Sequence, residues 1–356
     1  MAFARREFLT VSLTSAAALA AGSALAATNP PSGDPFGLTR DWNGTPATVM
    51  PDPAWEIHDK AFTGRLGNAM VERLWSGGRW TEGPVWMADW RCLLFSDIPT
   101  GRILRWNEDD GRVTVYSAQS NNANGHTRDR EGRLISCEHD SRRVTRLEHD
   151  GTITVLLDAF QGKKLNAPND VVVAADGAVW FTDPGYGILG AYEGHKADFE
   201  LPTNVYRIDP QSGEAQVAVG DFQRPNGIAF SPDGKRLYVS DTAGGGDPVK
   251  PCHLRAFNVG EGGKLDGGRV LIDAKNGVID GFRCDSDGNL WCSWAGDAAN
   301  NSVRVFSPEG QPLATLHLPE TVSNVEFGGP KGNRLFITGG QSLYATYVNA
   351  TAARRS

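Results

Sequence analysis

The chain alternates short apolar runs with glycine-containing turns, and sustained helical periodicity is scarce. Residues 224–241 are representative, with apolar runs at 228–230 and 237–240 joined by a Pro-Asp-Gly turn. Asn226 opens the first run and Asp241 follows the second. This pattern is typical of a β-hairpin, here with a polar residue at each open end.

The same hairpin recurs along the chain at intervals of propeller-blade length. Six first strands open on oxygen-bearing side chains spaced 42 to 57 residues apart, namely Glu82, Asn124, Asn169, Asn226, Asp280 and Asn324. Third and fourth strands follow five of the hairpins, whereas the sixth has only a third strand. A lone strand at 70–75 supplies what the sixth unit lacks. The sequence therefore predicts an all-β fold, a six-bladed β-propeller closed by an N-terminal strand that completes the last blade.

The N-terminus has the pattern of an export signal. Arg5 and Arg6 precede an apolar run that ends in an Ala-Leu-Ala cleavage pattern. The run is too short and too weakly apolar to span a bilayer well, although a retained anchor is the alternative. We expect a twin-arginine-type signal peptide at 1–26, use of the twin-arginine export machinery, and a periplasmic protein without membrane contact after signal removal. After the signal peptide, the sequence predicts an N-terminal extension at 27–68, which lies on the propeller, and the propeller itself at 69–350.

Composition and charge exclude some partners. A net charge of −7 and a pI near 5.6 give no electrostatic reason to expect nucleic acid or an anionic membrane. The five cysteines include no Cys-x-x-Cys pair and no zinc spacing, and most lie in apolar strand runs. Cys284 and Cys292 flank one hairpin turn and could form a disulfide. The oligomeric state is left open.

Propeller topology predicts where the side chains of the six opening residues lie. The first strand of each blade lines the central channel, and all six strands start at one face, so these side chains converge on the axis. Carboxylate and amide oxygens without a soft ligand suit a hard cation, Ca²⁺ above all, with Mg²⁺, Mn²⁺ or Zn²⁺ as alternatives. Turns alone would explain Asn226 and Asp280, which precede glycine, but not Glu82, which precedes Gly-Pro. We therefore predict a metal site on the axis.

Four motifs stand in order between about residues 70 and 347: Glu82-Gly83-Pro84, Pro168-Asn169-Asp170, Pro225-Asn226-Gly227-Ile228 and Asp280-Gly281. They resemble the gluconolactonase, regucalcin and luciferin-regenerating-enzyme family of calcium-dependent lactonases. Two further stretches are similar to its bacterial gluconolactonase branch: Asn124-Gly125-His126-Thr127 and Phe181-Thr182-Asp183-Pro184.

The resemblance implies metal ligands at Glu82, Asn226 and Asp280. It also implies that Asn169 lies near metal and substrate, and we count this amide as a fourth ligand. Ala167 stands where the regucalcin branch has an arginine, so contacts with a sugar lactone must differ from that branch.

Hydrolysis of a lactone needs a polarised carbonyl, an attacking water and stabilisation of the oxyanion, and a divalent cation can contribute to each. Because Ca²⁺ acidifies water less than Zn²⁺ does, a base is still useful. Asp280 is the first candidate, and the resemblance also points to this aspartate as ligand and base. His126 is the second, because a two-residue period places it on the same strand face as Asn124. A packed or solvent-facing histidine is the alternative for His126.

Insertions enlarge the third and fourth repeats, at 185–203 and 243–251, between their second and third strands. Such loops lie on the metal face and can wall the pocket. Together with the ring they provide candidate substrate contacts, namely Asn124, Asn169, Asp183, Tyr186 and His253, with Tyr192 and His195 as further loop candidates.

Other features have ordinary explanations. Asp97, Asp183 and Asp241 end second strands, where capping of a loop is the default use, although Asp183 and Asp241 could also reach a ligand. His139 and His149 stand in Glu-His-Asp tripeptides at strand ends or turns and are expected to be solvated. No Gly-x-Ser-x-Gly elbow supports a serine nucleophile.

The sequence thus predicts a carboxylic-ester hydrolase that opens a small-molecule sugar lactone, such as gluconolactone, to the aldonic acid with the help of a metal. Two alternatives use the same ligands. One is a calcium-dependent phosphotriesterase similar to diisopropyl fluorophosphatase. The other is a non-enzymatic, calcium-stabilised binding propeller.

Overall fold

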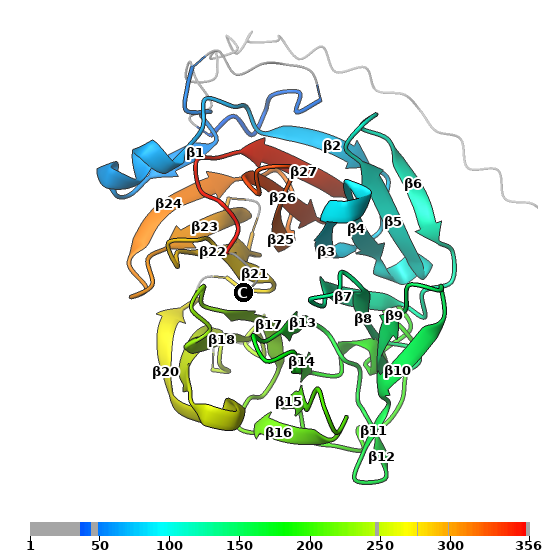
Figure 1. Ribbon diagram of the computed structural model, residues 1–356. Helices are drawn as coiled ribbons and strands as arrows, with labels where there is room; N and C mark the ends of the chain where they lie inside the picture. Colours follow the sequence, from blue (N-terminus) through cyan, green and yellow to red (C-terminus); the bar gives the residue numbers. More distant parts are fainter. Residues whose placement is uncertain (1–35, 44–48, 246–248, 276, 298, 354–356) are drawn as a thin grey trace, which may run out of the picture. The chain divides into compact units, whose positions relative to one another are not determined.

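The computed structural model describes residues 36–43, 49–245, 249–275, 277–297 and 299–353, and the predicted signal peptide lies outside these ranges. The described residues form the predicted all-β propeller, with six sheets of four or five strands arranged around an axis (Figure 1). No helix in these ranges is long and apolar enough to cross a membrane.

Each sheet is an antiparallel meander that runs from the axis outward. Blades one to three contain β3 (Thr81–Met87), β4 (Cys92–Asp97), β5 (Arg102–Asn107) and β6 (Val113–Ser117); β7 (Ala123–Arg128), β8 (Leu134–Glu138), β9 (Arg143–Leu147) and β10 (Ile153–Leu157); and β13 (Val171–Val173), β14 (Val179–Asp183), β15 (Asn204–Ile208) and β16 (Ala215–Val219). Blades four to six contain β17 (Pro225–Phe230), β18 (Arg236–Asp241), β19 (His253–Val259) and β20 (Leu265–Asp273); β21 (Phe282–Cys284), β22 (Leu290–Trp294), β23 (Ser302–Phe306) and β24 (Pro312–His317); and β25 (Val322–Gly328), β26 (Arg334–Gly339) and β27 (Ser342–Tyr347).

Short elements connect the blades. A small hairpin of β11 (Ala159–Phe160) and β12 (Lys163–Lys164) lies between blades two and three in the sequence. Short 3-10 helices complete the set: η1 (Lys60–Arg65), η2 (Ala88–Trp90), η3 (Ile98–Thr100), η4 (Tyr186–Ile188) and η5 (Glu261–Gly263).

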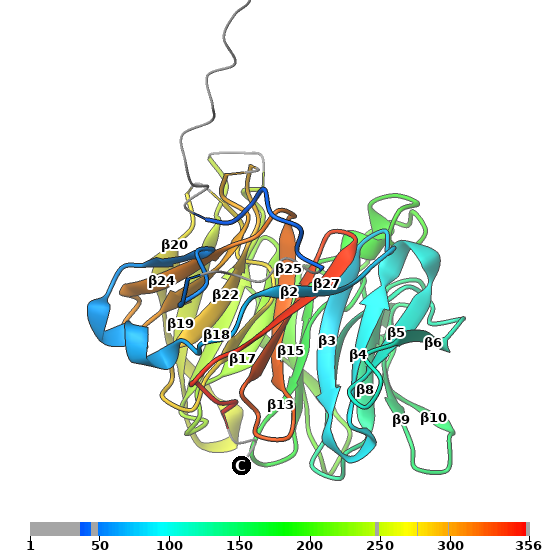
Figure 2. The same ribbon diagram turned by 90° about the horizontal axis from the view of Figure 1, so that it is seen from above.

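Blade six is completed by a strand that precedes blade one, as predicted. β2 (Glu72–Ser76) pairs antiparallel with β27, from Glu72 opposite Ala345 to Ser76 opposite Ser342 (Figure 2). The lone strand in the sequence is therefore the fourth strand of the last blade. Its pairing covers the outer edge of β27 with main-chain hydrogen bonds.

The segment before β2 is more deeply integrated than the extension that the sequence predicted. β1 (Trp55–Ile57) pairs with β24 and gives blade five a fifth strand. Trp55 meets Trp291 edge to face, with ring centroids 6.2 Å apart, and Phe62 is buried in the same core. Burial of these aromatic side chains attaches the segment to the propeller, although its Pro, Gly and Asp content suggested a surface extension.

Apolar side chains fill the spaces between neighbouring sheets. Trp180 of blade three packs with Ile228 of blade four in one such core. The core between blades four and five includes Cys284 and Cys292, and all five cysteines are free thiols. Cys284 faces Leu290 across its hairpin, so no disulfide links the two cysteines.

Four of the six inner strands are irregular at their first residues. The pairing register shifts between Glu82 and Val85 in β3, and similar shifts occur near the starts of β7, β17 and β25. A β-bulge inserts a residue and turns the side chains beside it in a new direction. The side chains beside these bulges belong to the predicted axial ring.

Candidate active site on the propeller axis

The opening residues of the inner strands come together at one end of the channel. Asn124 Nδ2 donates to Asn169 Oδ1 at 2.6 Å, and Asn169 Nδ2 donates to Asn226 Oδ1 at 3.1 Å. Asn226 is also hydrogen-bonded to the Asp280 side chain. Asn324 Nδ2 donates to Glu82 Oε2 at 3.0 Å. The structure therefore brings all four predicted metal ligands, with Asn124 and Asn324, into one cluster, which we call the axial ring.

Glycines let the inner strands approach closely enough for these contacts. A Cβ atom on Gly83 would clash with the backbone oxygen of Asn124, and one on Gly227 would clash with the backbone oxygen of Asp280. Gly125 approaches the backbone oxygen of Asn169 in the same way, and Gly281 packs against the side chain of Asn324. These Asn-Gly and Asp-Gly pairs therefore serve contacts between blades and not hairpin turns.

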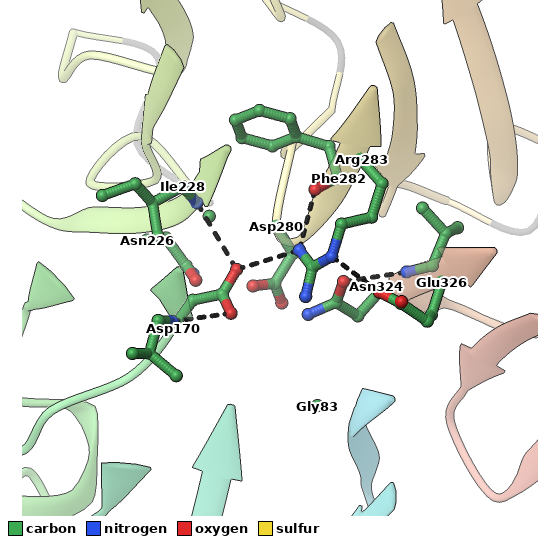
Figure 3. Close-up of polar contacts among 12 residues, drawn as sticks. Gly83, Asp170, Asn226, Ile228, Asp280, Phe282, Arg283, Asn324 and Glu326 are labelled. Carbon is green, nitrogen blue, oxygen red and sulfur yellow. Dashed lines mark hydrogen bonds and ion pairs between the residues drawn. The ribbon is translucent and has the colours of Figure 1, made fainter. Parts of the chain in front are cut away.

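Two carboxylates share the axial ring in poorly solvated surroundings. Burial raises the pKa of Glu82 to about 8, and the charge of Asp170 acts in the same direction. Burial also raises the pKa of Asp280 well above its usual range, with further contributions from the charges of Glu82 and Glu193. Figure 3 shows the Asp280 carboxylate in the channel, beside Asp170. A bound divalent cation would favour the ionised form of both ligands and lower these pKa values.

The predicted ligands fit a hard divalent cation by their donor atoms. Glu82 and Asp280 offer carboxylate oxygens, and Asn169 and Asn226 offer amide oxygens in the same cluster. The part of the chain that the structure describes has no group of three or more His, Cys, Asp or Glu side chains arranged for a metal. Amide oxygens are therefore needed to complete the ligand set, and oxygen-only sets are those that Ca²⁺ and Mg²⁺ prefer.

A buried arginine next to the ring was missed by the sequence analysis. Arg283 Nε donates to Glu326 Oε2 at 2.9 Å, and its Nη1 lies 3.5 Å from Asp170 Oδ2 (Figure 3). A charged residue three positions after Asp280, on a strand expected to line the axis, was the available signal. The ion pairs compensate the buried guanidinium and two of the buried carboxylates in the channel.

His126 is fully buried in β7, between Ser96 of β4 and Ser136 of β8. Its Nε2 and Nδ1 each lie 2.8 Å from one of the two serine hydroxyls. Burial lowers the pKa of His126 to about 3. The register shift between Ala123 and His126 also interrupts the two-residue period that predicted a common face with Asn124. The arrangement is that of a packed histidine, and its role as a base stays a prediction.

Asp97, Asp183 and Asp241 cap the loops before the inner strands of their own blades. The two carboxylate oxygens of Asp183 accept from the backbone N–H groups of Asn166 and Ala167, at 2.8 and 2.6 Å. Asp97 and Asp241 accept from the equivalent pairs of backbone N–H groups. A substrate contact by Asp183 would have to compete with these bonds, and it stays a prediction.

Of the two predicted substrate contacts Tyr186 and His253, only Tyr186 is connected to the axial ring by hydrogen bonds among the described residues. The Tyr186 hydroxyl, in η4, lies 2.5 Å from Thr242 Oγ1. Thr242 accepts in turn from Asn226 Nδ2 at 3.3 Å. His253 begins β19, opposite Asp241 in the sheet of blade four, and is half-buried. Among the described residues, hydrogen bonds connect Tyr186 to the ring and leave His253 outside it.

The blade-three insertion, residues 185–203, places Glu193 beside His139 and close enough to the ring for its charge to act on Asp280; the sequence had not singled out Glu193. His139 Nδ1 lies 3.1 Å from the Glu193 backbone oxygen and 3.8 Å from its carboxylate. Burial raises the pKa of Glu193 to about 7, and its charge adds to the raised pKa of Asp280. His139 is fully buried, so the expectation of a solvated histidine was wrong. The insertion covers a tripeptide that looked like an exposed turn.

The same insertion extends over its neighbouring blades. The Tyr192 hydroxyl donates to the Arg79 backbone oxygen at 3.1 Å, just before blade one. His195 Nδ1 lies 2.5 Å from Asp140 Oδ1, just after β8 of blade two, and the His195 side chain is exposed. The insertion is therefore anchored to blades one and two on the face that carries the axial ring, as its predicted position implied.

A cavity of about 580 Å³ opens at the other end of the inner strands. It is lined by residues that include Arg128 at the end of β7, Phe230 at the end of β17 and Cys284 at the end of β21. The axial ring lies at the strand starts, so this cavity lies toward the opposite ends of the strands, and Arg283 is among the residues that line it.

A six-bladed propeller with acidic and amide side chains gathered at one end of its channel is the class of protein that these observations define. The sequence profile described as the SMP-30/Gluconolactonase/LRE-like region matches residues 80–341. The match covers well over half of the chain. The chain therefore belongs to this family, as the motif resemblance indicated.

Relatives with lactonase names extend over most of the chain. Gluconolactonase of Zymomonas mobilis is 29% identical over 298 residues, which cover 77% of this chain and 80% of the relative. The 6-deoxy-6-sulfogluconolactonase of Pseudomonas putida is 28% identical over 269 residues, covering 72% and 82%. The solved structure of a Xanthomonas campestris gluconolactonase has 37% identity and a TM-score of 0.75, covering 87% of this chain and 99% of that one.

We predict that His126 makes the fold less stable as the pH falls. The pKa of His126 is about 3 in the folded chain, against an ordinary value of 6.5, so between these values only the unfolded chain takes up the proton. The contribution of His126 to the free energy of unfolding is therefore complete above pH 6.5 and declines below it. The decrease in the free energy of unfolding between pH 6.5 and 4 should therefore be roughly 3 kcal/mol smaller in His126→Gln than in the wild type. Urea unfolding at each pH measures it.

The matched control for this pH series is His149→Gln, which replaces an exposed histidine. Its unfolding free energy should follow the wild-type pH dependence. Parallel curves for the wild type and His126→Gln would contradict the prediction.

Proposed function

We propose that the chain hydrolyses a sugar lactone, such as gluconolactone, to the corresponding aldonic acid. The lactonase names of its relatives support hydrolysis of a lactone. The observation that carries the proposal is the gathering of Glu82 and Asp280 with the amides Asn169 and Asn226 at one end of the channel. Such a group of oxygen donors can hold a cation beside an ester carbonyl.

We propose Ca²⁺ as this cation, held by Glu82, Asn169, Asn226 and Asp280. When bound, it would supply Lewis-acid polarisation of the lactone carbonyl. The oxygen-only donor set supports a hard cation, and the raised pKa values of both carboxylates support a need for positive charge there. Mg²⁺, Mn²⁺ and Zn²⁺ are the alternatives to be compared.

Asp280 is the proposed general base, accepting a proton from the attacking water at its carboxylate oxygen. A hydrogen bond with Asn226 orients this carboxylate, and Asp280 is partly exposed. Asn226 is held in turn by Asn169 and Thr242. His126 is a weaker candidate, because serine hydroxyls lie within hydrogen-bond distance of both of its ring nitrogens.

We predict that Asp280→Asn lowers kcat/KM for gluconolactone by at least about 100-fold, because the variant keeps an oxygen ligand but loses the basic carboxylate. Acid release followed in a pH-stat, after subtraction of spontaneous ring opening, measures the effect. Asp110→Asn, at an exposed turn, is the control and should retain wild-type activity. Activity retained by Asp280→Asn would contradict the base role and shift it toward His126.

We further predict that chelation of divalent metal abolishes turnover and that Ca²⁺ restores it. The metal-free chain is supplied with Ca²⁺, Mg²⁺, Mn²⁺ or Zn²⁺, and acid release from gluconolactone is compared with fluoride release from an organophosphate. Fluoride release without lactone hydrolysis would favour the phosphotriesterase. Stabilisation by Ca²⁺ without turnover of either substrate would favour the binding propeller. Metal-independent hydrolysis of every lactone would overturn the metal proposal.

We also propose export to the periplasm by the twin-arginine route, supported by the sequence pattern at Arg5 and Arg6. Replacement of both arginines by lysine should retain the full-length chain in the cytoplasm of a bacterial host. Cell fractionation and the mass change after loss of residues 1–26 measure the outcome. A processed, periplasmic double variant would argue against this route.

A further inference from the structure

The tautomer of His139 follows from its two neighbours. The backbone oxygen of Glu193, 3.1 Å from Nδ1, can only accept, so Nδ1 carries the proton. The amide nitrogen of Asn124, 3.3 Å from Nε2, can only donate, so Nε2 accepts. Burial lowers the pKa of His139 to about 4, which keeps the imidazole neutral at neutral pH.

This imidazole orients the amide of Asn124. Asn124 Nδ2 has two acceptors, His139 Nε2 and Asn169 Oδ1, so the nitrogen and oxygen of the amide are assigned by their surroundings. Asn124 Oδ1 is buried and has no hydrogen-bond partner within the described residues. A buried acceptor without a donor costs about 1–3 kcal/mol, so an unpartnered oxygen beside a candidate active site indicates a donor on the ligand.

We propose that His139 is a positioning residue: it holds Asn124 so that Oδ1 accepts a hydrogen bond from a hydroxyl group of the lactone. The inference rests on the proposed function and deepens it, because it assigns His139 and Asn124 to recognition of one hydroxyl group of the sugar lactone. A lactone without hydroxyl groups would leave Asn124 Oδ1 unpaired in the complex. A site built to bond a hydroxyl rejects an analogue that lacks it by the free energy of the unpaired group.

The same histidine connects the axial ring to the blade-three insertion. His139 follows β8, whereas Glu193 lies in the insertion, 54 residues along the chain. Gly187 packs so tightly on His139 that a Cβ atom there would clash with the imidazole. The orientation of Asn124 and the position of the insertion therefore depend on one side chain.

Two substitutions separate the two hydrogen bonds of His139. In His139→Asn the amide lies near the former Nδ1 position, so it can still donate to Glu193 but cannot reach Asn124. In His139→Gln the amide lies near the former Nε2 position, so it can still accept from Asn124. The measurement is the ratio of kcat/KM for glucono-δ-lactone to that for δ-valerolactone, which has no hydroxyl groups. Both rates are corrected for spontaneous hydrolysis.

We expect this ratio to fall about 10- to 100-fold in His139→Asn, mainly through KM for the hydroxylated lactone. In His139→Gln it should stay within about threefold of the wild type, as rescue by the retained acceptor. Asn124→Leu, which removes the accepting oxygen itself, should lower the ratio as much as His139→Asn does. If His139→Asn does not fold, Asn124→Leu replaces it in the comparison. His149→Asn, at an exposed histidine, is the control.

A wild-type ratio in both His139→Asn and Asn124→Leu would overturn the inference. Equal losses in His139→Asn and His139→Gln would also overturn it, because anchoring of the insertion would then explain the effect. An equal fall in kcat/KM for both lactones would overturn it as well. Asn124 Oδ1 would then accept a hydrogen bond from a water needed in both reactions, and not from a hydroxyl group of the lactone. A wild-type protein that hydrolyses neither lactone would instead contradict the proposed function.

Discussion

The close approach of neighbouring inner strands is the constraint on which the axial site depends. After Glu82 and Asn226, the backbone oxygen of the next inner strand stands where the Cβ of any residue but glycine would lie. Gly125 approaches the backbone oxygen of Asn169 in the same way, beside the 2.6 Å hydrogen bond between the amides of Asn124 and Asn169. A larger residue at any of these glycines would push against the backbone of a ring residue and separate the blades. The site is thus a product of main-chain packing as much as of its own side chains.

The same crowding concentrates negative charge. Arg283 compensates Asp170 and Glu326 through ion pairs, whereas Glu82 and Asp280 are held mainly by amide groups. Ionised carboxylates in such surroundings destabilise the fold unless another charge joins them. The cation proposed for this site would supply that charge. Binding of a cation there would strengthen the fold and the site together.

Much of the fold was predictable because every blade repeats one hairpin, and the polar residue that opens each copy identifies the strand that lines the axis. The lone strand at 70–75 could be placed for the same reason, since one copy lacked a partner. Contacts between distant segments were not predictable. His139 looked exposed because a local tripeptide does not show that an insertion 54 residues later will cover it. The packing of His126 between two serines could not be chosen over a common face with Asn124 from the sequence, because a bulge interrupts the two-residue period of its strand.

Closure of blade six joins strands that are synthesised far apart in time. Apart from β1, β2 is the first strand of the propeller's blades to leave the ribosome, and its partner β27 is the last. Until Tyr347 has emerged, β2 lacks its native partner and presents an edge that can pair with the wrong strand. A chain interrupted before that point cannot close the ring. Completed translation is therefore a condition of a complete propeller, and a prematurely ended copy would expose an unpaired strand by which quality-control proteases and chaperones can recognise it.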